Sequence, residues 1–77
     1  MHNQMEMQQS TQEQAIRLTR VLELIERNKR LIDVYKQQSP EDALSTKQYM
    51  SLQNTYIAEL AELMKPYGVI VNYSAMA

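Results

Sequence analysis

The sequence lacks the residues on which most enzymes and small cross-linked domains depend. Its 77 residues include no cysteine, tryptophan or phenylalanine, one histidine and one glycine. Without cysteine there is no disulfide and no thiol nucleophile. His2, in a polar N-terminal segment, is not placed to act as a catalytic base or to complete a zinc site. Gly68 is isolated, so no glycine-rich loop can bind phosphate. We therefore predict that the protein is not an enzyme and binds no metal or cofactor.

Long apolar runs and a strong charge of either sign are also missing. No stretch approaches the ~20 apolar residues that cross a bilayer. The N-terminus lacks the basic segment and apolar segment of a secretion signal. These absences predict a cytoplasmic protein with no membrane segment. The net charge of −1 is not typical of a nucleic-acid-binding domain, so nucleic acid is not the expected partner.

The length of the chain limits the core that it can form alone. A chain this short is a single domain, and its core rarely contributes more than ~3–5 kcal/mol. Small proteins compensate with disulfides, metals or partner chains. The sequence excludes disulfides and provides no ligands for a metal. We therefore expect a homo-oligomer, with a dimer favoured.

Residues 11–37 are predicted to form the first helix. They follow a polar segment, residues 1–10, that is rich in Gln and Met and is expected to be a flexible arm. Glu13 lies three residues after Ser10, as in a capping box. Beyond this start the apolar residues recur with a seven-residue period typical of a coiled coil. The predicted core positions of this helix are Leu18, Val21, Ile25, Asn28, Ile32 and Tyr35.

The sequence QSPED, residues 38–42, interrupts this pattern. Pro40 disfavours a helical conformation at Ser39, so the first helix has to end before it. Ser39 followed by Pro40 also fits the N-cap and the first position of a new helix. We therefore predict a second helix over residues 40–65. Its predicted core positions are Met50, Gln53, Ile57, Leu60 and Met64.

The two repeats fit each other in an antiparallel hairpin. When the chain folds back at Ser39, the core positions of one helix face those of the other, as antiparallel coiled-coil packing requires. Ile25 then faces Gln53, Asn28 faces Met50, and Tyr35 faces Ala43. The predicted fold is all-α: a coiled-coil-like hairpin over residues 11–65.

Apolar residues beside the core stripe are more numerous than one hairpin can cover. A monomer rarely exposes a continuous apolar surface of that size, and two hairpins packed face to face would bury it in a four-helix bundle. The predicted dimer or partner interface comprises Leu24, Leu31, Tyr49, Leu52, Tyr56 and Leu63, with Val69, Ile70 and Val71 from the tail.

The tail, residues 66–77, is not expected to continue the second helix. Pro66 and Gly68 favour a turn, and the β-branched run Val69-Ile70-Val71 favours an extended or β segment. Three arrangements are open. The run can pair with its copy in a second chain, lie in a groove of the bundle, or add to the sheet edge of a different protein.

Two function classes are compatible with these features. The favoured one is a small helical protein–protein interaction or oligomerisation module, an adaptor or regulator without catalytic activity. The alternative is a nucleic-acid-associated regulator that uses a basic face of the first helix. The possible polyanion contacts on that face are Arg20, Arg27 and Arg30, but Glu23 and Glu26 are interleaved with them and reduce the net charge.

Overall fold

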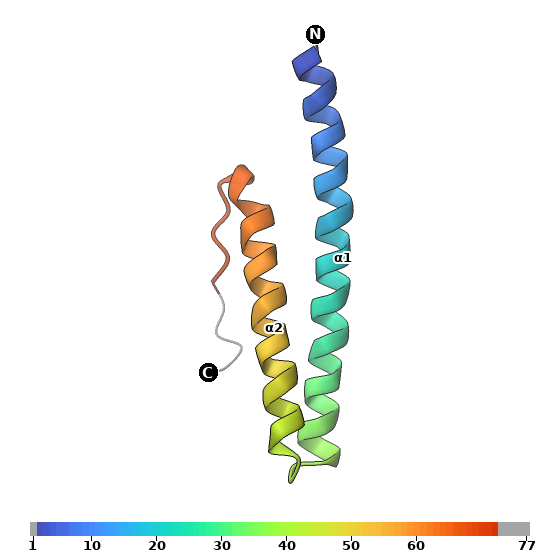
Figure 1. Cartoon of the computed structure of the whole chain (residues 1–77), viewed down its shortest axis with the longest axis vertical. Coiled ribbons are helices and arrows are strands. Elements are labelled where there is room, and N and C mark those ends of the chain that lie inside the picture. The colour runs from blue at the N-terminus through green and yellow to red at the C-terminus, as the bar shows by residue number, and fades with distance from the viewer. Residues whose placement is uncertain (1, 73–77) are drawn as a thin grey trace.

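Two antiparallel helices make up most of the described chain (Figure 1). The computed structural model describes the backbone of residues 2–72 and the side chains of residues 11–72. Helix α1 spans His2–Gln38 and helix α2 spans Ala43–Met64, followed by a short 3-10 helix, η1, at Lys65–Tyr67. The predicted all-α hairpin is confirmed, with no strand among the described residues. Neither helix in that part of the chain is long and apolar enough to cross a membrane.

The hairpin is elongated, so little of it is interior. Its extents are 59 × 19 × 13 Å and its radius of gyration is 16.1 Å, against about 11 Å for a compact chain of this length. The backbone of residues 2–10, which we expected to be a flexible arm, continues α1. Since α2 is shorter, the first turns of α1 extend past its end (Figure 1).

The turn between the helices differs from the prediction. The N–H of Ser39 donates to the carbonyl of Tyr35 at 2.9 Å, so Ser39 still belongs to the hydrogen-bond ladder of α1. The N–H of Asp42 donates to the carbonyl of Ser39 at 2.9 Å and closes a turn over Pro40 and Glu41. The cap of α2 is therefore Asp42, not Ser39, and the helix begins at Ala43, not at residue 40.

Asp42 caps α2 through its carboxylate. Oδ1 accepts a hydrogen bond from the N–H of Ser45 at 3.1 Å, which satisfies one of the free donors of the first turn. Hydrogen bonds from the Ser45 side chain and then from its backbone lower the pKa of Asp42, because both favour the ionised form.

The C-terminal end of α2 leads into the turn that the sequence predicted at Gly68. Gly68 has a φ of 70°, in the left-handed region that favours glycine. Its N–H donates to the carbonyl of Lys65 at 3.0 Å, and the N–H of Val69 reaches back to Met64 at 3.5 Å. This pair of bonds is a Schellman motif, and it turns the chain so that the tail runs in the direction opposite to α2 (Figure 1).

The core of the hairpin is small and half polar. Of the apolar residues, only Val21 and Ile32 are buried among those the structure describes. Asn28 and Gln53 are buried beside them. The other predicted core residues, which are Leu18, Ile25, Tyr35, Met50, Ile57, Leu60 and Met64, are half-buried.

Candidate interaction face

The buried amides fix how the two helices are aligned. Nδ2 of Asn28 donates to Oε1 of Gln53 at 2.9 Å and to the carbonyl of Tyr49 at 2.8 Å. Nε2 of Gln53 donates to the carbonyl of Ile25 at 3.2 Å. Gln53 therefore lies level with Ile25, as the sequence predicted, and Asn28 lies beside Tyr49, one residue from its predicted partner Met50.

A stacked ring pair shows which sides of the helices meet. The rings of Tyr35 and Tyr49 are 5.3 Å apart between centroids and inclined at 30°. The sequence placed Tyr35 opposite Ala43 and did not predict this contact between its ring and that of Tyr49. Tyr49 is correspondingly half-buried within the hairpin, so less of it is available to a partner than the sequence predicted.

The Tyr35–Tyr49 stack places two rows of apolar side chains on one side of the hairpin. Residues three, four or seven apart on a helix share a side. On α1, Leu24 and Leu31 precede Tyr35 at these spacings, and Val34 follows Leu31. On α2, Leu52 follows Tyr49 by three residues and Tyr56 follows it by seven. Leu63 follows Tyr56 by seven residues. We call this side the apolar face, and it comprises Leu24, Leu31, Val34, Tyr49, Leu52, Tyr56 and Leu63.

The apolar face remains partly open to solvent. Leu31, Val34 and Leu52 are 37%, 44% and 38% exposed. The other members, Leu24, Tyr49, Tyr56 and Leu63, are half-buried, although we expected them to be largely exposed. Val34 was missed from the sequence because it falls outside the core stripe, although its spacing of three from Leu31 could have identified it.

The opposite side of the hairpin is mainly polar. By the same spacing it carries Lys29, Asp33 and Lys36 on α1, with Lys47 and Asn54 on α2. The exposed apolar residues Leu22 and Leu44 share these spacings, and Met50 lines a hollow there with Lys36 and Lys47. The hairpin therefore has one apolar and one polar side, which is the pattern of a structure that packs on one side only.

The tail keeps its apolar run mostly in solvent. Val69 is exposed, Ile70 is 85% exposed and Val71 is half-buried. The run has no regular secondary structure within the described chain, and residues 73–77 of the predicted tail lie outside the described residues. Pairing with a second chain therefore stays a prediction.

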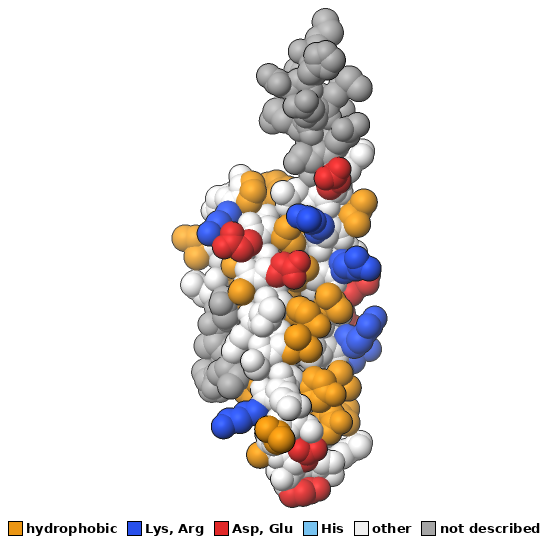
Figure 2. All heavy atoms as spheres, viewed as in Figure 1, with side chains coloured by type: hydrophobic (Ala, Val, Ile, Leu, Met, Phe, Trp, Pro, Cys, Tyr) orange, Lys and Arg blue, Asp and Glu red, His pale blue; other side chains and the backbone are white. Residues whose placement is uncertain are grey.

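The three predicted polyanion contacts differ in their surroundings. Arg30 forms an ion pair with Glu26 of the same helix, on an exposed surface. Arg20 and Arg27 are exposed and lie on the row beside Leu24 and Leu31. Figure 2 shows basic and hydrophobic side chains interleaved along the α1 edge of the molecule. These two arginines therefore border the apolar face.

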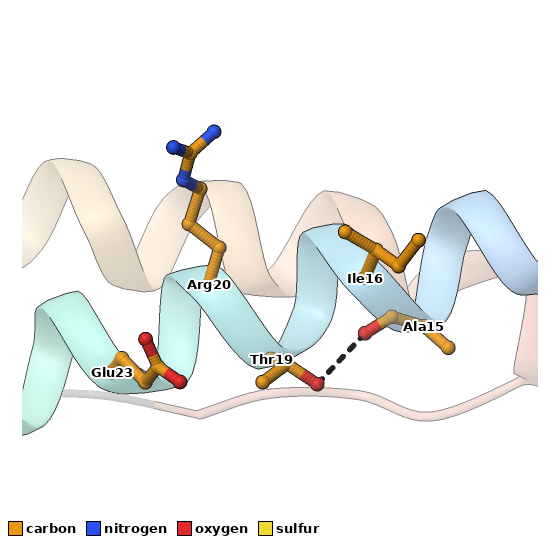
Figure 3. Close-up of a pocket in the computed structure, with 5 residues that line it drawn as sticks. All are labelled: Ala15, Ile16, Thr19, Arg20 and Glu23. Atoms are coloured by element: carbon orange, nitrogen blue, oxygen red, sulfur yellow. Dashed lines mark hydrogen bonds between the residues drawn. The ribbon is translucent and has the colours of Figure 1, made fainter.

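The surroundings of Arg20 appear in a close-up of the outer side of α1 (Figure 3). A shallow hollow there is lined by Ala15, Ile16, Thr19, Arg20 and Glu23. Thr19 donates to the carbonyl of Ala15 at 2.9 Å. The guanidinium of Arg20 points away from the helix, and Glu23 points to a different side (Figure 3). The ion pairs among the described residues do not join the two.

A second hollow lies at the open end of the hairpin. It has a volume of about 250 Å³ and is lined mainly by apolar groups of Leu18, Leu63, Met64 and Tyr67. Gln14 also lines it, and its buried Oε1 has no hydrogen-bond partner among the described residues. No group of three or more potential metal-ligating side chains occurs in the described chain.

Comparison with protein-family models, curated proteins and solved structures gives no match for this chain.

Proposed function

We propose that this protein is a small helical protein–protein interaction module that self-associates in the cytoplasm, as an adaptor or regulator without a catalytic step. Two copies pack their apolar faces together and form a four-helix bundle. The module then presents its polar sides, and the tail run Val69-Ile70-Val71, to other proteins.

The observation that carries the proposal is the mismatch between core and surface. Val21 and Ile32 are the buried apolar side chains of the described hairpin, while its apolar face stays partly open. Burial of an apolar side chain contributes about 1.5–3 kcal/mol, and ordering each residue costs about 1–2 kcal/mol. A hairpin with so small an interior gains much from a second apolar surface.

The direct test is the oligomeric state in solution. Light scattering and sedimentation at micromolar concentration are expected to give twice the mass of the chain. The double substitution Leu31→Glu with Leu52→Glu places carboxylates in the apolar face and is expected to give a monomer with a lower melting temperature. A monomeric wild-type chain with a cooperative thermal transition would contradict the proposal.

A matched control comes from the polar side. Leu22 and Leu44 are also exposed, at 48% and 69%. One lies on α1 and the other on α2, as Leu31 and Leu52 do. Leu22→Glu with Leu44→Glu adds the same charge but leaves the apolar face intact. This variant is expected to remain a dimer, so charge alone does not explain dissociation.

A further inference from the structure

Three charged side chains at the border of the apolar face, Arg20, Arg27 and Glu59, lack ion-pair partners among the described residues. The ion pairs of the described residues are Glu26 with Arg30 and Glu62 with Lys65, each within one stretch of chain. Arg20 on α1 and Glu59 on α2 are exposed and belong to neither pair. Arg20 precedes Leu24 by four residues, and Glu59 follows Tyr56 by three residues. Both therefore lie beside residues of the apolar face.

Arg20 and Glu59 also lie at the same height along the hairpin. The hydrogen bond from Gln53 to the carbonyl of Ile25 sets the alignment of the two helices. Five residues before Ile25 is Arg20, and six residues after Gln53 is Glu59, so the two differ by about one residue, or ~1.5 Å of rise. They occupy opposite edges of the same face.

Two hairpins can stack their apolar faces about a two-fold axis in two ways. An axis parallel to the helices keeps every residue at its own height and places α1 of one copy over α2 of the other. An axis perpendicular to the helices places α1 over α1 and α2 over α2. The two arrangements bring different border residues together.

The charges distinguish these arrangements. Residues 11–38 carry six basic and four acidic side chains, and α1 borders its apolar row with Arg20 and Arg27. With α1 over α1, these arginines face the arginine border of the second copy. With α1 over α2, Arg20 meets the partner's Glu59 at the same height, and the axis repeats the contact. Opposite charges across an interface favour the arrangement with α1 over α2, which has its axis parallel to the helices.

The apolar residues fit the same arrangement. Equal heights place Leu24 within two residues of the level of the partner's Tyr56, and Leu31 within two residues of the level of the partner's Tyr49. Leucine then packs against the larger tyrosine rings, and large and small side chains alternate across the interface as close packing requires.

We infer that the dimer forms about a two-fold axis parallel to the helices, with α1 over α2 of the second copy and Arg20 paired with the partner's Glu59. This inference rests on the proposed self-association. It assigns Arg20 and Glu59 the role of selecting the arrangement of the two hairpins, rather than contact with a polyanion.

Charge exchange tests the pair. Arg20→Glu and Glu59→Arg are each expected to weaken dimerisation about three- to thirty-fold, because the axis repeats each exposed pair. The double variant is expected to return to within about two-fold of wild type. Arg30→Glu, which breaks a pair within α1, is the control and is expected to leave the dimer unchanged. Failure of the double variant to recover would overturn the assignment.

Cross-linking separates the arrangement from self-association itself. Because the chain has no cysteine, Arg20→Cys and Glu59→Cys chains each carry a single thiol. A short bifunctional thiol reagent is expected to link the mixture of the two variants and not either variant alone. Linkage within Arg20→Cys alone, or no linkage in the mixture while wild type remains dimeric, overturns the arrangement. A monomeric wild-type chain overturns the proposed function as well.

Discussion

Asn28 and Gln53 are joined across the hairpin by a hydrogen bond of 2.9 Å, from Nδ2 of Asn28 to Oε1 of Gln53. Each amide also reaches the backbone of the opposite helix, at Tyr49 and at Ile25. A buried polar group is costly when it is unpaired, so sliding one helix along the other would break all three bonds. The pair therefore selects one alignment, and the charged border inferred above depends on it.

Replacing one of these amides should destabilise the hairpin. Asn28→Ala removes the donor for Gln53 and for the Tyr49 carbonyl, and it is expected to lower the free energy of unfolding by about 1–3 kcal/mol. Urea denaturation followed by circular dichroism measures the change. Asn54→Ala, at the half-buried edge of α2, is the control and should change stability by less than about 0.5 kcal/mol. Equal losses of unfolding free energy in the two variants would show that the buried amide pair contributes no more than a residue at the edge of α2.

The Asp42 cap predicts a loss of stability in acid. Ser45 lowers the pKa of Asp42, first through its side chain and then through its backbone. Because the folded pKa is depressed, this contribution is present above the ordinary value of about 4. It is lost as the pH falls through the lower folded value. Asp42→Ala should lower the melting temperature at pH 7, and thermal melts between pH 2 and pH 7 should show a smaller acid loss for this variant. Glu41→Ala, in the same turn, is the matched control.

The tyrosine stack predicts a second pH effect, at the alkaline end. The pKa of Tyr35 is raised, chiefly by a hydrogen bond to the Tyr49 side chain, then by the charge of Tyr49, by burial and by Asp42. For a raised pKa, the contribution is complete below the unfolded value of about 10. It is lost as the pH rises through the folded value. Absorbance titration near 295 nm should resolve one tyrosine that ionises late. Tyr35→Phe should remove that step, whereas Tyr67→Phe, on an exposed ring, should not.

Gly68 should tolerate substitution poorly for reasons of backbone conformation alone. A Cβ at this position would meet no atom within 4 Å, but the φ of 70° is unfavourable for other residues. Gly68→Ala is expected to cost about 1–2 kcal/mol, and Gly68→Asn less, since asparagine accepts left-handed geometry more readily. Chemical denaturation of both variants measures the costs. The same loss in both would point to a cause other than the backbone.

Periodicity and turn residues were sufficient for the main elements. The seven-residue repeat predicted two helices, and the placement of Ile25 opposite Gln53 agrees with the hydrogen bond that joins them. Gly68 was expected to turn the chain, and it does so in the left-handed conformation. Each prediction rests on local stereochemistry or on repeat spacing, which the sequence contains directly.

The exact cap and the role of Tyr49 could not be obtained in this way. Ser39 and Asp42 are both good caps, and the choice depends on whether α1 retains the N–H of Ser39, as it does. Tyr49 lies on the flank of its helix by spacing, yet it is half-buried and its ring stacks on that of Tyr35. Competition between adjacent caps and between side-chain orientations is decided by the packed structure.

Helix periodicity and turn chemistry are local, so the amino-acid sequence was enough to predict an antiparallel helical hairpin with many apolar residues beside its core. The pairing of the amides, the apolar side of the hairpin and the charges along its border became visible only once the two helices were packed together. Those properties depend on the alignment and rotation of two helices, which are set by contacts between residues far apart in the chain.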